Sequence, residues 1–391
     1  MIKRLVSPDS VAVTGVITGL ISVPLAWLTL RPNRLAGGTG MSLWGGMGWG
    51  AAAVIAGLWL ACLALVLLGK SRRQFIALGI FLNLVVFATF IFSGSGSSDL
   101  LDGAASISRV SLGMGIWITC LGAYIGIFSC RQRLKTSPVW QNLVSWSGLI
   151  SIAVLLASGW LNDLSIVVEF HRQQAQFGRE LWNHVLLFSG SVVAGTVIGI
   201  PLGIWASRSR HAERPIFFIT NIVQTVPSLA LFGLLIAPLT ALSLAYPVLS
   251  EWGISGIGAA PAIIALVLYS LLPVARNTYT GLRHLDPAVI DAGTGMGMSR
   301  MQVFRKIEVP LSAPLVLEGI RTASVQAVGN TAVAALIGAG GLGWFIFQGI
   351  SQAATDVVIL GAVPIMVMAL VVDIVMRQAV SVATPKGMVT R

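Results

Sequence analysis

The chain has 391 residues, of which 55% are hydrophobic and only 10% are charged. Its mean hydropathy is +0.86 and its formal net charge is +11. In soluble domains roughly a quarter of the residues are charged, because a compact chain cannot hide so much apolar surface. The composition therefore excludes a soluble globular enzyme, a disordered chain and a disulfide scaffold. It indicates a membrane protein with several spans.

Apolar, uncharged runs of about 20 residues, the length that crosses a bilayer as a helix, recur along the chain. We expect an all-α fold, a polytopic membrane bundle of about ten transmembrane helices. Region 1–162 is predicted to hold five, 163–183 to be a polar periplasmic connection, and 184–391 to hold the other five. The expected spans are Val11–Leu30, Leu43–Gly69, Phe75–Phe92, Val110–Cys130, Leu143–Leu161, Val185–Ser207, Pro215–Leu239, Gly253–Ala275, a run from Leu315, and Val357–Met376.

The distribution of Lys and Arg tests this arrangement. Nineteen of them lie in segments on one predicted side of the membrane, together with both chain ends, and five lie on the other side. Basic residues concentrate in cytoplasmic loops. The bias therefore predicts a multi-pass protein of the cell inner membrane with both termini in the cytoplasm, and it explains the net charge without nucleic acid.

The residue pattern predicts no catalytic, metal or cofactor site. The three cysteines lie in or beside apolar runs, and the four histidines are scattered over both predicted sides. Gly338–Gly343 spells G-x-G-x-x-G but lacks the strand and the acidic residue of a dinucleotide site, so we expect a tight turn outside the ninth span. Asp99 and Asp102 are assigned to an outer Gly/Ser-rich loop. Uphill transport would need energy from an ion gradient or from another subunit.

The longest predicted cytoplasmic segment, 276–314, has the clearest local pattern. Asp286 is a good N-cap, and Pro287 suits the first position of a short helix. Gly293, Gly295 and Gly297 are expected to end that helix, since glycine turns most freely.

A second short helix is expected after this glycine hinge. Ser299 and Gln302 form a capping-box pattern, and Pro310 is expected to stop the helix. Met298, Met301 and Phe304 recur every three residues and predict an apolar stripe along one face. Such a stripe either docks onto a partner or lies on the membrane surface, and the local chemistry leaves both interpretations open.

The segment resembles the signature cytoplasmic loop of ABC importer permeases. That pattern is Glu-Ala-Ala, three residues, Gly, nine residues and Ile-x-Leu-Pro. The matching positions are Asp291, Ala292, Gly293, Gly297, Ile307, Val309 and Pro310, with substitutions at the first, third and sixth of these. The resemblance implies a type I ABC importer permease core in the C-terminal half, with a coupling loop that docks onto a separate ATP-hydrolysing subunit. The docking residues that it implies are Asp291, Ala292, Gly293, Gly297, Met301, Phe304, Ile307 and Pro310.

Further stretches resemble permeases for glycine betaine, choline and related osmoprotectants. They are Gly199–Gly203, Gln224–Ala230, Gly319–Ala323 and Ile337–Gly343. The first five spans match nothing in that core, as in a long, YehY-like form. The resemblance implies small osmoprotectants as solutes. The implied partners are an ABC ATP-binding subunit, a periplasmic or extracellular solute-binding protein, a second permease subunit (the same or a paralogue) and membrane lipid.

Polar residues inside spans are candidates for the translocation path, because burying them in hydrocarbon is costly. Asn221, Gln224 and Asn330 qualify. Hydrogen bonding between helices is the commoner role for such residues, and it remains the alternative. Two ion pairs at helical spacing are expected as helix-end anchors. They are Glu318 with Arg321 and Asp373 with Arg377.

An ion-coupled secondary transporter is the rival hypothesis. Five plus five spans would give the two halves opposite orientations, as in an inverted repeat. Pro24 and Pro201 fall in the first span of each half, where a broken helix could bind solute. The halves, however, share no evident sequence similarity, and the first half has no counterpart of the glycine-hinged segment.

Overall fold

The computed structural model describes residues 9–34, 36–68 and 71–385. The basic residues at the two chain ends lie outside these ranges. The chain divides into two compact units, Met1–Arg172 and Gln173–Arg391. The division falls within the segment 163–183 that was predicted to connect two membrane regions. This segment is largely helical, with α6 (Ser165–Arg172) in the first unit and the start of α7 in the second.

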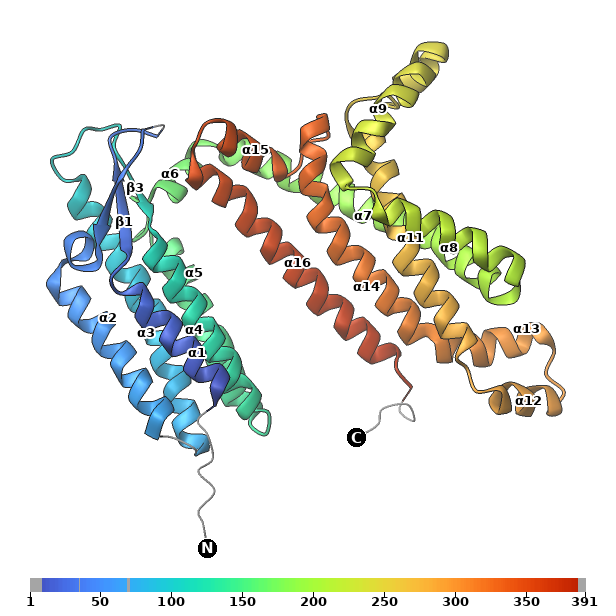
Figure 1. The fold of residues 1–391 in the computed structure, drawn as a ribbon, viewed down its shortest axis with the longest axis horizontal. Helices are drawn as coiled ribbons and strands as arrows, with labels where there is room; N and C mark the ends of the chain where they lie inside the picture. The colour runs from blue at the N-terminus through green and yellow to red at the C-terminus, as the bar shows by residue number, and fades with distance from the viewer. Residues whose placement is uncertain (1–8, 35, 69–70, 386–391) are drawn as a thin grey trace, which may run out of the picture. The chain divides into compact units, whose positions relative to one another are not determined.

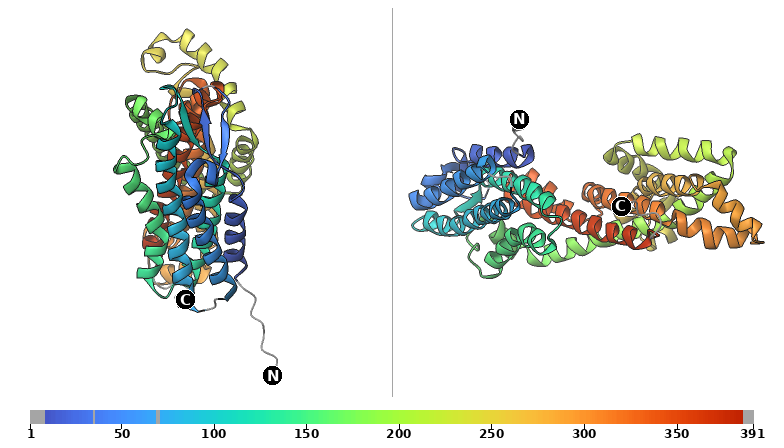
Figure 2. Two further views of the ribbon diagram at one scale, coloured as in Figure 1. Left: turned by 90° about the vertical axis from the view of Figure 1, so that its left-hand side faces the viewer. Right: turned by 90° about the horizontal axis from the view of Figure 1, so that it is seen from below.

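The first unit is a helical bundle capped by a small sheet (Figures 1 and 2). Within the bundle, α3 packs against α2, α4 and α5, while α1 packs against α4. The side chain of Asp9 caps α1 and also pairs with Arg133 of α4 at 2.9 Å. The bundle helices are α1 (Ser10–Ser22), α2 (Leu43–Leu68), α3 (Arg72–Leu101), α4 (Met114–Arg133) and α5 (Pro138–Ala157).

The sheet replaces part of the first predicted span. Its antiparallel strands lie in the order β2 (Thr39–Ser42), β1 (Ala26–Arg31), β3 (Arg109–Leu112). The expectation of one continuous helix over Val11–Leu30 is wrong, because α1 ends after 13 residues. Pro24 has no amide to donate to Leu20, and the following residues pair with β3 instead. A 13-residue helix is about 20 Å long, which is less than the bilayer core.

The Gly/Ser-rich stretch after the third predicted span is helix rather than loop. Helix α3 continues to Leu101, so the assignment of Asp99 to a loop is wrong, whereas Asp102 is the C-cap and begins the turn that follows the helix. Serine hydroxyls within the stretch donate to carbonyls of the same helix. The glycines permit close packing: a Cβ on Gly96 would lie 2.3 Å from the carbonyl oxygen of Gly46. Low hydropathy here reflects tight packing of helices, not exposure in a loop.

Helices α1 and α4 approach each other through paired small residues. A Cβ on Gly15 would lie 2.6 Å from the backbone nitrogen of Gly126, and one on Gly122 would lie 2.5 Å from that of Gly19. Each helix therefore presents glycines four residues apart to the other. Such spacing lets helix backbones come close together in a membrane, where packing rather than the hydrophobic effect holds helices together.

The second unit is built around α7, α11 and α14, which pack against one another, with α16 against α14 (Figure 1). Helix α9 packs more lightly on α11 and α14. The helices are α7 (Gln174–Arg208), α8 (Arg210–Thr225), α9 (Ser228–Ala245), α10 (Pro247–Glu251), α11 (Ala259–Arg283), α12 (Pro287–Gly295), α13 (Arg300–Val303), α14 (Val309–Ala334), α15 (Gly343–Ser351) and α16 (Thr355–Ala383), with a π-helical turn η1 (Phe304–Glu308) and a 3-10 turn η2 (Ala335–Ile337).

Eight helices in the described ranges are long and apolar enough to cross a membrane. Of the ten predicted spans, the exceptions are the first, which is the short α1, and the ninth, which is the 26-residue α14. The seventh is displaced, because the expected helix Pro215–Leu239 is broken into α8 and α9. Val226 precedes a proline and adopts an extended ψ of 128°, as steric contact with the ring requires. The predicted membrane helical bundle is confirmed.

Substituting Gly122→Leu should destabilise the first unit. The added side chain would overlap the backbone of α1 at Gly19, and overpacking of this kind costs about 1–3 kcal/mol. We expect a lower thermal unfolding midpoint for the purified protein in detergent. Gly57→Leu is the matched control, because a Cβ there meets nothing within 4 Å. Equal midpoints for the two variants would contradict the close packing of α1 and α4.

Candidate coupling segment

The segment between α11 and α14 begins with the predicted helix. Asp286 caps α12, and its carboxylate accepts a hydrogen bond from the Ala288 amide at 2.9 Å. Pro287 occupies the first turn, where its missing amide removes no helical bond. Both local predictions are confirmed.

Only one of the three glycines turns the chain. Gly297 has a φ of +81° and Gly295 is the last residue of α12, whereas Gly293 lies inside the helix, so the expectation that all three end the helix is wrong for Gly293. Gly293 is buried, and a Cβ there would lie 2.5 Å from Cδ1 of Ile307. The glycine therefore sets the close approach of α12 to η1. Gly293 is therefore required for its small size and not for its backbone flexibility.

The second helix begins as predicted and ends differently. The Ser299 hydroxyl accepts from the Gln302 amide at 3.4 Å, and the Gln302 side chain accepts from the Ser299 amide at 2.8 Å, which completes a capping box. Pro310 does not end the helical path, because α13 continues through η1 directly into α14. In η1 the Val309 amide donates to the Phe304 carbonyl five residues back. This wider turn places Pro310 in the first turn of α14, where its missing amide is tolerated.

The predicted apolar stripe is only partly on the surface. Met301 is 61% exposed, whereas Met298 and Phe304 are half-buried. Met296, which the spacing did not single out, is 75% exposed and adds to the apolar surface. The remaining predicted docking positions are exposed at Asp291, Ala292, Gly297 and Pro310, half-buried at Ile307 and buried at Gly293.

Arg208 at the end of α7 fastens the segment to the rest of the unit. Its guanidinium pairs with the carboxylate of Glu308, which is 7% exposed, and lies 5.8 Å from the ring centroid of Phe304. A hollow of about 550 Å³ separates α12 from this anchor. It is lined by Arg208, Ile290, Thr294, Arg300, Met301, Val303, Phe304 and Glu308. Sequence reasoning missed the anchor because Arg208 and Glu308 are 100 residues apart and no local spacing relates them.

The three path candidates are not joined in one cluster. Gln224 donates to the Tyr269 carbonyl at 2.5 Å and accepts from Gln326 at 3.1 Å, so it links α8 to α11 and α14. Asn221 is exposed and Asn330 is half-buried. Within the described ranges, no hydrogen bond connects Gln224 to either asparagine.

Residues 195–380 match the family described as "Binding-protein-dependent transport system inner membrane component". The choline transport system permease protein OpuBB of Bacillus subtilis is 37% identical over 207 residues, which cover 53% of this chain and 88% of that protein. The osmoprotectant import permease protein OsmW of Salmonella typhimurium is 40% identical over 206 residues, which cover 53% of this chain and 91% of that protein. The chain belongs to this family of ABC importer permeases.

The N-terminal part of the permease matches a different family. Residues 7–167 match "ABC transporter permease YehY, N-terminal domain". Among solved structures, an inward-facing form of the MetNI methionine ABC transporter aligns with a TM-score of 0.48 and 22% identity, over 55% of this chain and 99% of that chain. Since the two halves match two different families, they do not support the rival interpretation as an inverted repeat.

The permease is not itself an enzyme, because ATP hydrolysis in this family belongs to a separate ATPase subunit. It works with an ATP-binding subunit and a solute-binding protein, and it is a multi-pass protein of the inner membrane. The resemblance of the coupling segment and of the osmoprotectant-permease stretches identified the family correctly.

Both predicted ion pairs are present, and the tertiary structure joins them. Arg321 lies 2.5 Å from Glu318, and Arg377 lies 2.7 Å from Asp373. Arg321 also lies 2.7 Å from Asp373. The four charges therefore form one network that ties α14 to α16, rather than two separate anchors.

The glycine-rich stretch Gly338–Gly343 forms the predicted turn, between η2 and α15. The buried Glu180 carboxylate accepts from the Gly341 amide at 2.6 Å. His184 Nδ1 accepts from the Leu342 amide at 3.2 Å, so its proton lies on Nε2, which faces the Val328 carbonyl at 3.1 Å. Two side chains of α7 thus satisfy backbone groups that the turn would otherwise leave unpaired.

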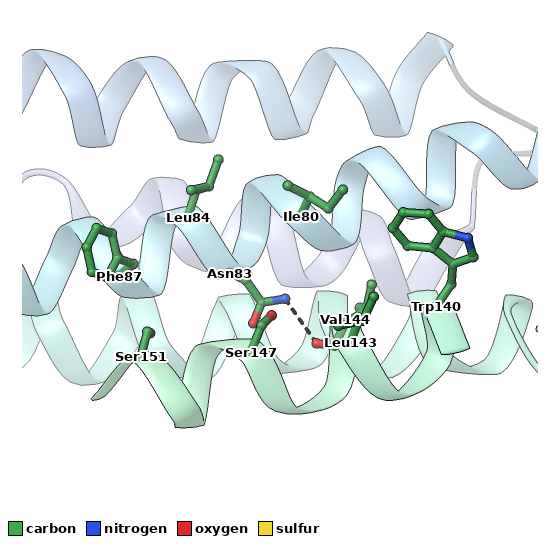
Figure 3. A pocket seen from close by; sticks show the side chains of 9 residues that line it. All are labelled: Ile80, Asn83, Leu84, Phe87, Trp140, Leu143, Val144, Ser147 and Ser151. Atoms are coloured by element: carbon green, nitrogen blue, oxygen red, sulfur yellow. Dashed lines mark hydrogen bonds between the residues drawn. The ribbon is translucent and has the colours of Figure 1, made fainter. Parts of the chain in front are cut away.

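An apolar groove of about 360 Å³ lies in the first unit between α3 and α5 (Figure 3). Asn83 crosses from α3 to α5, where its amide donates to the Val144 carbonyl at 3.0 Å. Ser147 and Ser151 also line the groove, and the remaining lining is hydrocarbon or the Trp140 ring. No local pattern predicts this groove, because its lining comes from two helices that are distant along the chain.

Arg208→Gln should loosen the coupling segment. Removing the guanidinium leaves the buried Glu308 carboxylate without this cation. The expected loss in local stability is only about 1 kcal/mol, because Arg208 is half exposed and solvent screens the ion pair. We expect roughly fivefold faster hydrogen exchange in residues 304–309. Arg210→Gln is the matched control, since Arg210 is exposed at the start of α8. Unchanged exchange in Arg208→Gln would show that the ion pair does not hold the segment.

Proposed function

We propose that this permease imports a small quaternary ammonium osmoprotectant, such as choline or glycine betaine, driven by ATP hydrolysis on a separate subunit. The observation that carries the proposal is the similarity to permeases named for those solutes. A further relative is the glycine betaine/carnitine/choline transport system permease protein OpuCD of Bacillus subtilis. It is 38% identical over 199 residues, which cover 51% of this chain and 80% of that protein.

In this proposal the ATP-binding subunit docks onto the exposed surface of α12 and α13. Asp291 and Ala292 on α12, with Met301 on α13, present one charged group and apolar contacts to the partner. Gly297 holds the two helices at a fixed angle, since its φ of +81° is unfavourable for any other residue. The half-buried Phe304 and Ile307 support this surface from below rather than form it.

A displacement of the docked segment would reach the membrane helices by two routes. One is covalent, since α13 continues through η1 into α14 without a loop. The other is the Arg208 anchor, which ties the segment to α7. The ion network of Arg321 and Asp373 extends the first route to α16. Packed helices move as rigid bodies, so the segment would shift α7, α14 and α16 between inward-open and outward-open arrangements.

Asn221, Gln224 and Asn330 are proposed to lie along the solute path. The side-chain hydrogen bonds of Gln224 join α8 to α11 and α14, which is the alternative role of such residues, and they would be remade when those helices move. The proposed complex also contains a solute-binding protein and a second permease subunit. Both termini are proposed to lie in the cytoplasm, on the basis of the bias in basic residues.

Reconstitution tests the solute and the energy source together. Proteoliposomes holding the permease, its ATP-binding subunit and its solute-binding protein should accumulate labelled choline or glycine betaine when ATP is supplied. Labelled arginine, which has no quaternary ammonium, is the control solute and should not accumulate. Accumulation of choline by the permease alone under a sodium or proton gradient, or arginine uptake equal to that of choline, would contradict the proposal.

Asp291→Arg and Gly297→Trp should abolish co-purification of the ATP-binding subunit while leaving the permease in the membrane. The first reverses the charge of the docking surface, and the second changes the angle between α12 and α13. Asp99→Arg is the control for charge, since Asp99 is exposed in the other unit. Gly253→Trp is the control for size, since Gly253 has a similar φ of +76°, lies outside the docking surface, and a Cβ there meets nothing within 4 Å. Retention of the ATPase by both test variants would rule out docking at this surface.

A further inference from the structure

Three arginines and one carboxylate gather beside the sheet of the first unit, where Arg34 pairs with Glu169 and both act electrostatically on Arg109 together with Arg172. Arg34 follows β1, Arg109 begins β3, and Arg172 ends α6, which also supplies Glu169. Three guanidinium groups against one carboxylate leave a formal excess of two positive charges. The family assignment does not account for this arginine cluster, defined by Arg34, Arg109, Arg172 and Glu169.

The register of the sheet adds a fourth guanidinium. Arg31 of β1 lies directly opposite Arg109 of β3, so the two side chains leave the sheet on the same face. Like charges directly opposite each other destabilise a strand pair. The sheet therefore gathers positive charge at one place.

Burial makes the excess charge more costly. Arg109 is 7% exposed, and its Nη1 donates to the Ser108 carbonyl at 2.7 Å. Its Nε is buried without a hydrogen-bond partner, as is Nη2 of Arg34. The pKa of Arg109 is lowered by burial and by the Arg172 guanidinium, with a smaller contribution from Arg34, while Glu169 opposes the shift. Buried charged donors of this kind normally have partners.

Oε1 of Glu169 accepts no hydrogen bond from these donors. Its side chain is 1% exposed, and its Oε1 lies 3.5 Å from Nε of Arg34, which is an ion pair without a hydrogen bond. A carboxylate or phosphate group suits the remaining donors, because planar guanidinium groups present paired N–H groups to two oxygens. Arg172 is exposed and leaves the cluster open to a ligand from outside.

Aromatic residues indicate the depth of the cluster. Trp44 and Trp49 begin α2 directly after β2, at the same end of the bundle, and are 42% and 76% exposed. Their rings stack with centroids 5.9 Å apart. Exposed tryptophans of membrane proteins concentrate at head-group level. The arginine cluster would therefore meet both phospholipid phosphates and anions in solution.

We propose that the arginine cluster is a binding site for a phosphate group, carried either by an anionic phospholipid or by a free anion. The site belongs to the first unit and is independent of the coupling segment. Its ligand would neutralise the excess charge and accept hydrogen bonds from the unpartnered N–H groups of Arg109 and Arg34. Bound phosphate would thereby stabilise the sheet and its connection to α6.

Thermal unfolding of the full-length permease tests the site. In detergent, sodium phosphate should raise the unfolding midpoint above that in sodium chloride of equal ionic strength, because a ligand that binds only the folded state stabilises it. In nanodiscs, phosphatidylglycerol should raise it above that in phosphatidylcholine. A response in detergent identifies a free anion as sufficient, whereas a response only in nanodiscs identifies the lipid as the source.

Matched arginine variants separate the site from general charge effects. Arg109→Gln should need a roughly tenfold higher phosphate concentration for the same rise in the unfolding midpoint, because it removes one charge-assisted hydrogen bond. Arg172→Gln, at an exposed position, should weaken it without affecting folding. Arg72→Gln, exposed at the start of α3, removes the same charge elsewhere and should leave the response intact. A wild-type protein that responds to neither phosphate source, or cluster variants that respond as Arg72→Gln does, would overturn the proposal.

Discussion

A backbone in hydrocarbon has no water to hydrogen-bond, so each membrane segment must satisfy its own amides and carbonyls. This constraint decides where the permease can interrupt a helix. Pro24 and Pro227 lie at helix ends, where the chain passes into a strand or a short turn. At Pro310 the helix continues, because the π-helical turn before it shifts the hydrogen bonds by one residue. Proline therefore lies at a helix end in two of these cases, and in the third the helix continues through it.

The coupling segment connects an exposed surface to the membrane helices through short-range packing. Gly293 permits Ile307 to approach α12, and Arg208 holds Glu308 and Phe304 from the end of α7. Because η1 runs directly into α14, no flexible loop lies between the proposed docking surface and the core of the second unit. A movement of α12 and α13 would therefore also move α14. A permease that has no energy source of its own requires such a rigid connection to its ATPase.

The first unit combines close contacts at small residues with a core of large apolar side chains such as Trp27 and Trp59. Glycines four residues apart bring α1 and α4 together, and the Gly/Ser stretch of α3 packs closely on its neighbours. Helices that approach this closely gain dispersion contacts along their length, which is the main source of helix association in a bilayer. The sheet at one end of this bundle then gathers arginines from three separate segments, which gives the unit a chemistry of its own beside the shared transport core.

The sequence by itself determined what short spacings encode. The composition indicated a membrane bundle, and the adjacent Asp286 and Pro287 predicted the first cap. Residues three or four apart predicted the cap at Ser299 and the ion pairs of Arg321 and Arg377, because the helical repeat fixes such neighbours. Only the tertiary structure decided which glycine turns and which packs, that β1 replaces the end of the first predicted span, and that Arg208 meets Glu308. Those outcomes depend on contacts between segments far apart in the chain, and no local pattern carries that information.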